Sequence, residues 1–236
     1  MPGLNLKADR MKKNAGLYLF VISLFADLAG VYFKNEMLVY AAKPLVVITL
    51  IIYFLAATSG FKSNLIRLVF ASLAFSWLGD VLLMFEPMNG NFFIFGLVAF
   101  LIAHLFYILF FLNIRRIEMV SLKTGLIILV IAYYTGLIFL LYNYLGEMKI
   151  PVMMYGIVIS IMFLLAIHML FIKNKKAGRL MMLGALLFIS SDSILAINKF
   201  YDPFESTGIF TMLTYGFAQL FITLGAERYI TSTSKQ

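Results

Sequence analysis

The stretch FFIFGLVAFLIAHLFYILFFL, residues 92–112, decides the fold of this chain. It runs for 21 residues without an aspartate, glutamate, lysine or arginine, and a membrane-spanning helix needs about 20 apolar residues. Similar stretches precede and follow it, and we expect helices at about 15–33, 38–58, 64–85, 92–112, 123–145, 150–172, 179–198 and 207–228. The sequence therefore predicts an all-α polytopic bundle of eight transmembrane helices. These spans fill the chain, so residues 1–236 are expected to form a single integral membrane domain.

Composition supports a membrane protein. Hydrophobic residues make up 63% of the 236 residues and charged residues only 13%, about half the charged share of soluble proteins. The absence of cysteine excludes thiolate nucleophiles, Cys-ligated zinc and disulfides. The net charge of +8 is read as a signal of topology in such a chain, so we expect membrane lipids and no nucleic acid as partners.

The distribution of the basic residues predicts the orientation. With the N-terminus inside, the inner segments hold 15 of the 19 basic residues, as the preference of Lys and Arg for the cytoplasmic side requires. An odd number of spans would break this alternation. We therefore expect both termini in the cytoplasm. The inner basic residues are Lys7, Arg10, Lys12, Lys13, Lys62, Arg67, Arg115, Arg116, Lys123, Lys173, Lys175, Lys176, Arg179, Arg228 and Lys235.

Four ionisable residues lie inside the predicted spans: Asp27, Lys43, Asp80 and Asp192. Each would cost a few kcal/mol in lipid unless it is paired or hydrated. At about 1.5 Å per residue, all four lie roughly 8–10 Å below the outer edge of the hydrocarbon. A shared depth indicates one polar cavity that opens toward the outer leaflet. Because one lysine accompanies three aspartates, at least one aspartate is expected to be protonated or to share a proton.

Helical spacing places further polar residues on the same inward faces. These are Ser76, His104, Tyr107, Ser191, Asn198, Tyr215 and Gln219. Structural roles are open beside functional ones, because membrane serines often bond back to their own helix and a lone histidine often bridges two helices. Asp27 and Lys43, on consecutive helices, would equally form a structural ion pair.

A weak internal repeat accompanies the two aspartates. Aligning Asp80 with Asp192, which are 112 residues apart, pairs LGDVLL (78–83) with SSDSIL (190–195). A four-plus-four parallel duplication would produce this pattern, and so would coincidence.

Several catalytic motifs are absent. The two histidines are 64 residues apart and form no H-x-x-x-H pair, and there is no G-x-S-x-G elbow or phosphate-binding glycine loop. The chemistry that the sequence offers is a pair of carboxyl groups, Asp80 and Asp192, and we expect no metal and no cofactor.

The chain resembles the YhhN-like family of integral membrane lysoplasmalogenases. The resemblance rests on an ordered set of motifs across most of the chain. These are Lys43-Pro44-Leu45, FSWLGDVLLM (75–84), the face Gly96, Phe100, His104 and Tyr107, GALLFISSDSILA (184–196), and Tyr215 with Gln219. In the fifth and sixth helices the match is thin.

The resemblance implies an enzyme that hydrolyses the vinyl ether bond of a lysoplasmalogen in the bilayer. The products would be a fatty aldehyde and glycerophosphoethanolamine or glycerophosphocholine. Such a bond is cleaved after protonation of its β-carbon, which gives an oxocarbenium ion. As in glycoside hydrolysis, one carboxylic acid would supply the proton and one carboxylate would activate water, so we expect Asp80 and Asp192 to be the acid and the base in an unassigned order. The remaining polar residues would bind or orient substrate: Asp27, Lys43, Ser76, His104, Tyr107, Ser191, Asn198, Tyr215 and Gln219. A bacterial protein of this type would lie in the inner membrane, and a eukaryotic one in a membrane like that of the endoplasmic reticulum.

Two alternatives remain open at the level of sequence. A proton-coupled transporter of small molecules or lipids would also place carboxyl groups within the membrane. A lipid-binding scaffold would use the cavity without depending on its carboxyl groups.

Overall fold

A computed structural model describes the backbone of residues 2–233 and the side chains of residues 14–233. Within this part the chain is all-helical, and eight of its helices are long and apolar enough to cross a membrane, as predicted. Lys235 and the side chains of Lys7, Arg10, Lys12 and Lys13 lie outside the described part. The long helices are α1 (Pro2–Tyr32), α2 (Glu36–Ala57), α3 (Asn64–Met84), α4 (Asn91–Ile117), α5 (Thr124–Leu141), α6 (Lys149–His168), α7 (Lys175–Phe200) and α8 (Thr207–Thr233).

Side-chain caps fix where several helices begin. The side-chain oxygens of Asn35, Ser63 and Asn174 accept backbone N–H groups at the starts of α2, α3 and α7, which satisfies donors that have no partner within the helix. Several helices extend beyond the predicted spans: α1 begins at Pro2, and α4 and α8 each continue five residues past their predicted ends at 112 and 228. Phe110, Phe111 and Ile114 in the last turns of α4 are fully buried, so packing holds this end of the helix.

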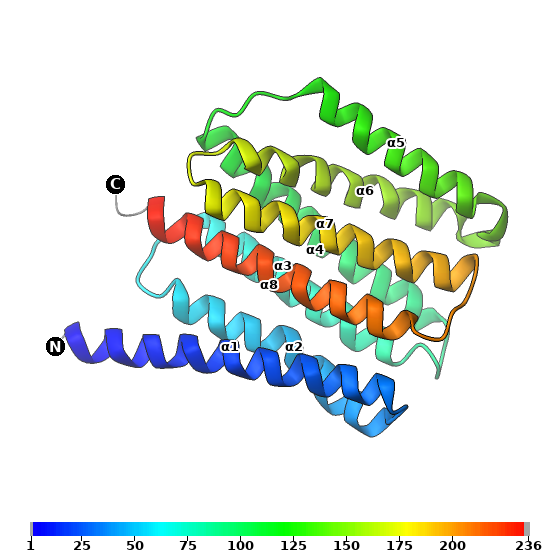
Figure 1. Ribbon diagram of the computed structural model, residues 1–236, viewed down its shortest axis with the longest axis horizontal. Helices are drawn as coiled ribbons and strands as arrows, with labels where there is room; N and C mark the ends of the chain where they lie inside the picture. The colour runs from blue at the N-terminus through cyan, green and yellow to red at the C-terminus, as the bar shows by residue number, and fades with distance from the viewer. Residues whose placement is uncertain (1, 234–236) are drawn as a thin grey trace.

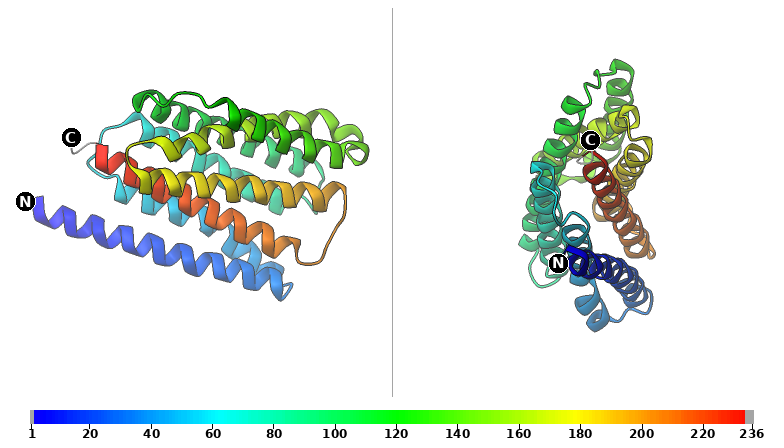
Figure 2. Two further views of the ribbon diagram at one scale, coloured as in Figure 1. Left: turned by 45° about the horizontal axis from the view of Figure 1, so that its top comes forward. Right: turned by 90° about the vertical axis from the view of Figure 1, so that its left-hand side faces the viewer.

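The helices run alternately in opposite directions, so both described ends of the chain lie at the same end of the bundle (Figure 1). Three hairpins, α1–α2, α3–α4 and α7–α8, pack along their lengths, and α6 fills the space between α4 and α7. Helix α8 also contacts α1, α2 and α3 and thereby closes a ring of seven helices. Helix α5 packs outside this ring against α6 (Figure 2).

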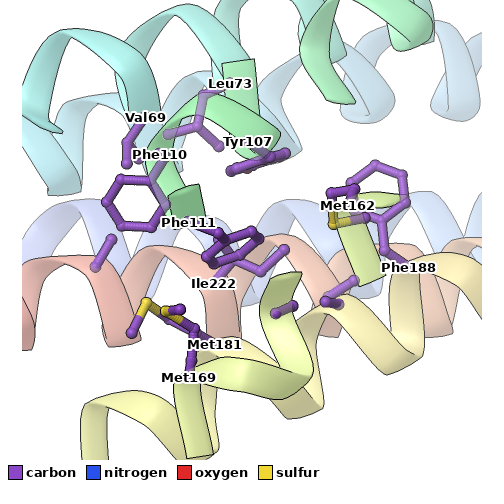
Figure 3. Packing of buried hydrophobic residues seen from close by; sticks show 14 of the residues in the cluster. Val69, Leu73, Tyr107, Phe110, Phe111, Met162, Met169, Met181, Phe188 and Ile222 are labelled. Carbon is purple, nitrogen blue, oxygen red and sulfur yellow. The ribbon is translucent and has the colours of Figure 1, made fainter. Parts of the chain in front are cut away.

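The core of the ring is built from aromatic and methionine side chains of α3, α4, α6, α7 and α8. Tyr107, Phe111, Met162, Phe188 and Ile222 meet there, each with no exposed surface (Figure 3). In lipid no hydrophobic effect drives helices together, so close packing of this kind must stabilise the bundle.

A close backbone approach sets the position of α7 against α8. A Cβ atom on Gly184 would lie 2.7 Å from the backbone nitrogen of Ile222 and 2.8 Å from the carbonyl oxygen of Ala218. Only glycine permits this contact, as in other small-residue helix pairs. The approach brings the helix of Asp192 against the helix of Tyr215.

Candidate active site

A cavity of about 250 Å³ lies among α2, α3, α4, α6, α7 and α8, at the end of the bundle opposite the chain termini. Lys43, Asp80 and Asp192 line it, so three of the four predicted intramembrane ionisable residues share one cavity. Most of the remaining lining is apolar, with Leu97, Phe100 and Leu195 among its members.

Asp80 is held by a chain of hydrogen bonds that links α3, α8 and α4. The Tyr215 hydroxyl donates to Oδ2 of Asp80 at 2.7 Å. Nε2 of Gln219 lies 3.4 Å from the Tyr215 oxygen, and Tyr107 donates to Oε1 of Gln219 at 2.7 Å. Asp80 is 4% exposed and the other three residues are buried. Tyr215 and Gln219, one turn apart on α8, therefore fix one oxygen of Asp80 and leave the other toward the cavity.

Asp192 has different neighbours. The Tyr155 hydroxyl of α6 donates to its Oδ2 at 2.5 Å, and Nε2 of His104 lies 3.8 Å from the same oxygen. Nδ1 of His104 is 2.6 Å from the Phe100 carbonyl oxygen. A carbonyl only accepts, so Nδ1 carries a proton, and Nε2 of the neutral ring presents a lone pair. No described residue hydrogen-bonds Nε2.

Lys43 is the only cationic side chain among the residues that line the cavity. It lies on α2, which packs against α1, the helix of Asp27, and against α3, the helix of Asp80. Asp27 of α1 is fully buried outside the cavity lining, and neither of its carboxyl oxygens has a hydrogen-bond partner among the described residues. The structure therefore places Asp27 near Lys43 without the hydrogen bond that a tight ion pair would make.

The remaining predicted residues divide between lining and packing. Ser191 and Asn198 line the cavity, but Ser191 donates to the Thr211 carbonyl oxygen at 3.0 Å, and Asn198 accepts from the Thr207 hydroxyl at 2.7 Å. Both therefore join α7 to the start of α8. Ser76 is fully buried in α3 away from the lining, and no described residue hydrogen-bonds its hydroxyl.

Two ionisable residues that line the cavity are not among the site residues predicted from the sequence. Tyr155 contacts Asp192 from α6, and Glu86 lines the cavity from the turn after α3. A signal for Tyr155 is present in the repeat, because Tyr155 follows Lys43 by 112 residues, the same interval that separates Asp80 from Asp192. Tyr107 and Gln219, which hydrogen-bond each other, are also 112 residues apart. Glu86 gives no such signal, because a charge in a turn is unremarkable.

The arrangement suits acid–base chemistry on an amphiphilic molecule. Two carboxyl groups, one on α3 and one on α7 and each oriented by a tyrosine, line the same cavity. Within the described residues no three His, Asp or Glu side chains group closely enough to hold a metal ion. Because Lys43 is the one cation of the cavity lining, the electrostatic surroundings of Asp80 and Asp192 differ.

Comparison with known proteins gives a family match and several similar proteins. A family model described as the YhhN family matches residues 38–226, a range that holds the whole cavity lining. Lysoplasmalogenase TMEM86B of Mus musculus is 30% identical over 183 residues, or 77% of this chain and 72% of the relative.

Lysoplasmalogenase TMEM86A of Homo sapiens is 33% identical over 167 residues, which are 67% of this chain and 64% of the relative. Lysoplasmalogenase TMEM86B of Rattus norvegicus is 32% identical over 158 residues, or 66% of this chain. The matched part of this chain spans 60% of the rat relative's length. No solved structure matches the chain.

Proposed function

The chain belongs to the YhhN family, and from this premise we propose that it is an ether hydrolase that cleaves the vinyl ether bond of lysoplasmalogens. The observation that carries the proposal is the pair Asp80 and Asp192 in one largely apolar cavity within a membrane bundle. The names of the curated relatives, lysoplasmalogenases TMEM86A and TMEM86B, support the same substrate class. The substrate is an alkenyl glycerophosphoethanolamine or glycerophosphocholine.

The reaction needs one acid and one base. A carboxylic acid protonates the β-carbon of the vinyl ether and leaves an oxocarbenium ion. Water then adds to the cationic carbon while a carboxylate removes its proton and stabilises the positive charge, as in glycoside hydrolysis. The resulting hemiacetal breaks its bond to the glycerol oxygen. The net reaction consumes one water and releases a fatty aldehyde and a glycerophospho-alcohol.

The unequal surroundings of the two carboxyl groups support an assignment of roles. Lys43 is the cation of the cavity lining and lies on α2, which packs against α3, the helix of Asp80, and a nearby positive charge favours a carboxylate. Asp192 faces a phenol and the lone pair of His104 instead. We assign Asp80 as the base and Asp192 as the acid. Because Tyr155 occupies Oδ2 of Asp192, Oδ1 is the oxygen that delivers the proton.

The lining also suggests how the substrate lies. Lys43 would bind the phosphate, since an unpaired ammonium in the membrane needs an anion. The alkenyl chain would follow Leu97, Val152 and Leu195, which line the cavity from α4, α6 and α7. This placement leaves the vinyl ether between the two aspartates.

A proton-coupled transporter is the competing class. Transporters of that class commonly bind substrate at interrupted helices, whereas α2 continues through Pro44 and the eight long helices within residues 2–233 are unbroken. A flux of solute into liposomes that persists in Asp80→Asn would favour transport over hydrolysis.

The deciding test is aldehyde release by purified protein in detergent with lysoplasmalogen as substrate. We expect activity in the wild type and a loss of at least about 100-fold in Asp80→Asn and in Asp192→Asn. Asp202→Asn, at an exposed position after α7, is the matched control and should keep wild-type activity. Wild-type protein without activity, or both variants at full activity, would refute the proposal.

A further inference from the structure

An ion pair lies at the end of the cavity farthest from the bundle interior. The ammonium of Lys199, the second-last residue of α7, donates to Oε1 of Glu86, two residues beyond α3. Glu86 lines the cavity, and its side chain is 29% exposed against 41% for Lys199. The Lys199 ammonium also lies 5.0 Å from the centre of the Phe93 ring. The pair is therefore held at the cavity mouth by α3, α4 and α7.

Glu86 occupies a position that disfavours an acid. The C-terminal end of a helix carries partial negative charge, so a cation is the favourable residue there. Lys199 compensates Glu86, but it engages only Oε1. No other described residue contacts the carboxylate in an ion pair, so Oε2 remains available to a second donor from the cavity.

The charges along the cavity follow an order. Lys43 and Asp80 lie inside it, and Glu86 follows Asp80 by six residues, of which the four to the end of α3 alone rise about 6 Å toward the mouth. A zwitterionic lipid head group has the complementary order, because its phosphate is attached to glycerol and its ammonium lies beyond the phosphate. With the phosphate at Lys43, the ammonium reaches toward Glu86.

We propose that Glu86 binds the ammonium of a zwitterionic lysophospholipid and thereby selects ethanolamine or choline head groups over a phosphomonoester head group. This inference rests on the proposed function for the identity of the lipid class and adds the part of the lipid that is recognised. Lys199 neutralises Glu86 when no head group is bound. A phosphomonoester would instead bring extra negative charge toward the Glu86 carboxylate.

Binding of two non-cleavable lipids in detergent tests the proposal. The probes are a saturated alkyl-ether lysophosphoethanolamine and the matching alkyl glycerophosphate, titrated calorimetrically against the purified full chain. We expect the wild type to bind the ethanolamine lipid more tightly than the phosphomonoester lipid. Glu86→Gln should bind the ethanolamine lipid about fivefold more weakly, while its affinity for the phosphomonoester lipid should not fall. Glu147→Gln, an exposed acid at the same end of the bundle, should change neither affinity.

Two further variants separate recognition from a merely structural ion pair. Lys199→Met removes the pair but keeps Glu86, so recognition predicts that the preference for ethanolamine survives, whereas a structural role predicts the same loss as in Glu86→Gln. The swap of Glu86→Lys with Lys199→Glu restores the pair and should remove or reverse the preference. Equal loss for both lipids in Glu86→Gln, or wild-type preference in the swap, would overturn the proposal. Because neither probe is hydrolysed, failure of aldehyde release alongside a retained preference would reject only the proposed reaction.

Discussion

Asp80 and Asp192 are chemically identical residues that the fold places in unequal surroundings. Asp80 accepts a hydrogen bond from the Tyr215 hydroxyl and shares the cavity with the cation of Lys43. Asp192 accepts a hydrogen bond from the Tyr155 hydroxyl and lies beside Nε2 of His104. Enzymes that use two carboxyl groups commonly assign acid and base roles through such differences. In the proposed mechanism, the single cation in the cavity lining is therefore what distinguishes the two acids.

Tyr155 offers a test of this mechanism. Tyr155→Phe removes the hydrogen bond that fixes Oδ2 of Asp192, and we expect kcat for aldehyde release to fall about 10- to 100-fold, because the proton donor is then no longer held in place. The thermal unfolding midpoint should change by only a few degrees. Tyr134→Phe is the control, since its hydroxyl makes one long contact, 3.4 Å, to the Met153 carbonyl away from the cavity. Equal activity of both variants would remove Tyr155 from the mechanism.

Lys43 has two possible effects that kinetics separates. Lys43→Gln should lower kcat/KM about tenfold or more for a lysoplasmalogen, because a charge-assisted phosphate contact is lost. For a 1-alkenylglycerol, which has no phosphate, the loss should be smaller. If both substrates lose equally, Lys43 acts through the charge of Asp80 and does not bind phosphate.

Some residues of the candidate site can be predicted from the sequence, and others cannot. Asp80, Asp192 and Lys43 are ionisable groups inside apolar stretches, and their cost in lipid makes them conspicuous. Tyr155 is a tyrosine in an apolar helix, so only the 112-residue interval would have indicated it. For Asn198 the reverse holds, because its position predicts substrate contact, while its Oδ1 accepts hydrogen bonds from Phe204 in the turn before α8 and from the Thr207 hydroxyl. A side chain's partner depends on packing between helices, which sequence spacing alone does not specify.

Among the elements, the existence of the helices is fixed by hydropathy, but their ends depend on local contacts. The predicted fifth span reaches 145, whereas α5 ends at Leu141 and two short 3-10 turns lead to α6. Gly146, with a φ of 51°, lies in this connection. Asn143 and Glu147 also lie in this connection, and its left-handed turn is a conformation that glycine permits.

The α7–α8 hairpin should be the element most sensitive to small increases in size. Gly184→Ala places a methyl group against the backbone of α8, and we expect a loss of stability of about 1–3 kcal/mol together with reduced activity. A lower thermal unfolding midpoint in detergent would report the change. Gly136→Ala in α5, where a Cβ meets nothing within 4 Å, should be neutral or stabilising because alanine favours helix. Similar midpoints for both variants would contradict close packing as the origin of the α7–α8 contact.

At the scale of the whole molecule, the polar cavity and the basic turns lie toward opposite ends of the bundle. The cavity lies toward the end of the bundle that carries the α3–α4 and α7–α8 turns, and the described chain ends lie at the opposite end. Within the described residues, the turns that hold the basic residues Lys62, Lys123 and Lys173 lie at the same end as the described chain ends. If that end is cytoplasmic, the cavity opens toward the outer leaflet, and the substrate must enter from that leaflet. Orientation therefore determines which pool of lysolipid the protein would consume.

Because the natural chain has no cysteine, single cysteines can report the orientation without background labelling. Met88→Cys and Ser206→Cys mark the exposed turns at the cavity end, and Ser121→Cys and Thr233→Cys mark the opposite end. In right-side-out vesicles we expect an impermeant maleimide to label the first pair directly and the second pair only after permeabilisation, since Lys and Arg are retained on the cytoplasmic side. The unmodified chain should remain unlabelled throughout. The reverse pattern would place the cavity toward the cytoplasmic leaflet, and the two aspartates would then act on lipid from inside the cell.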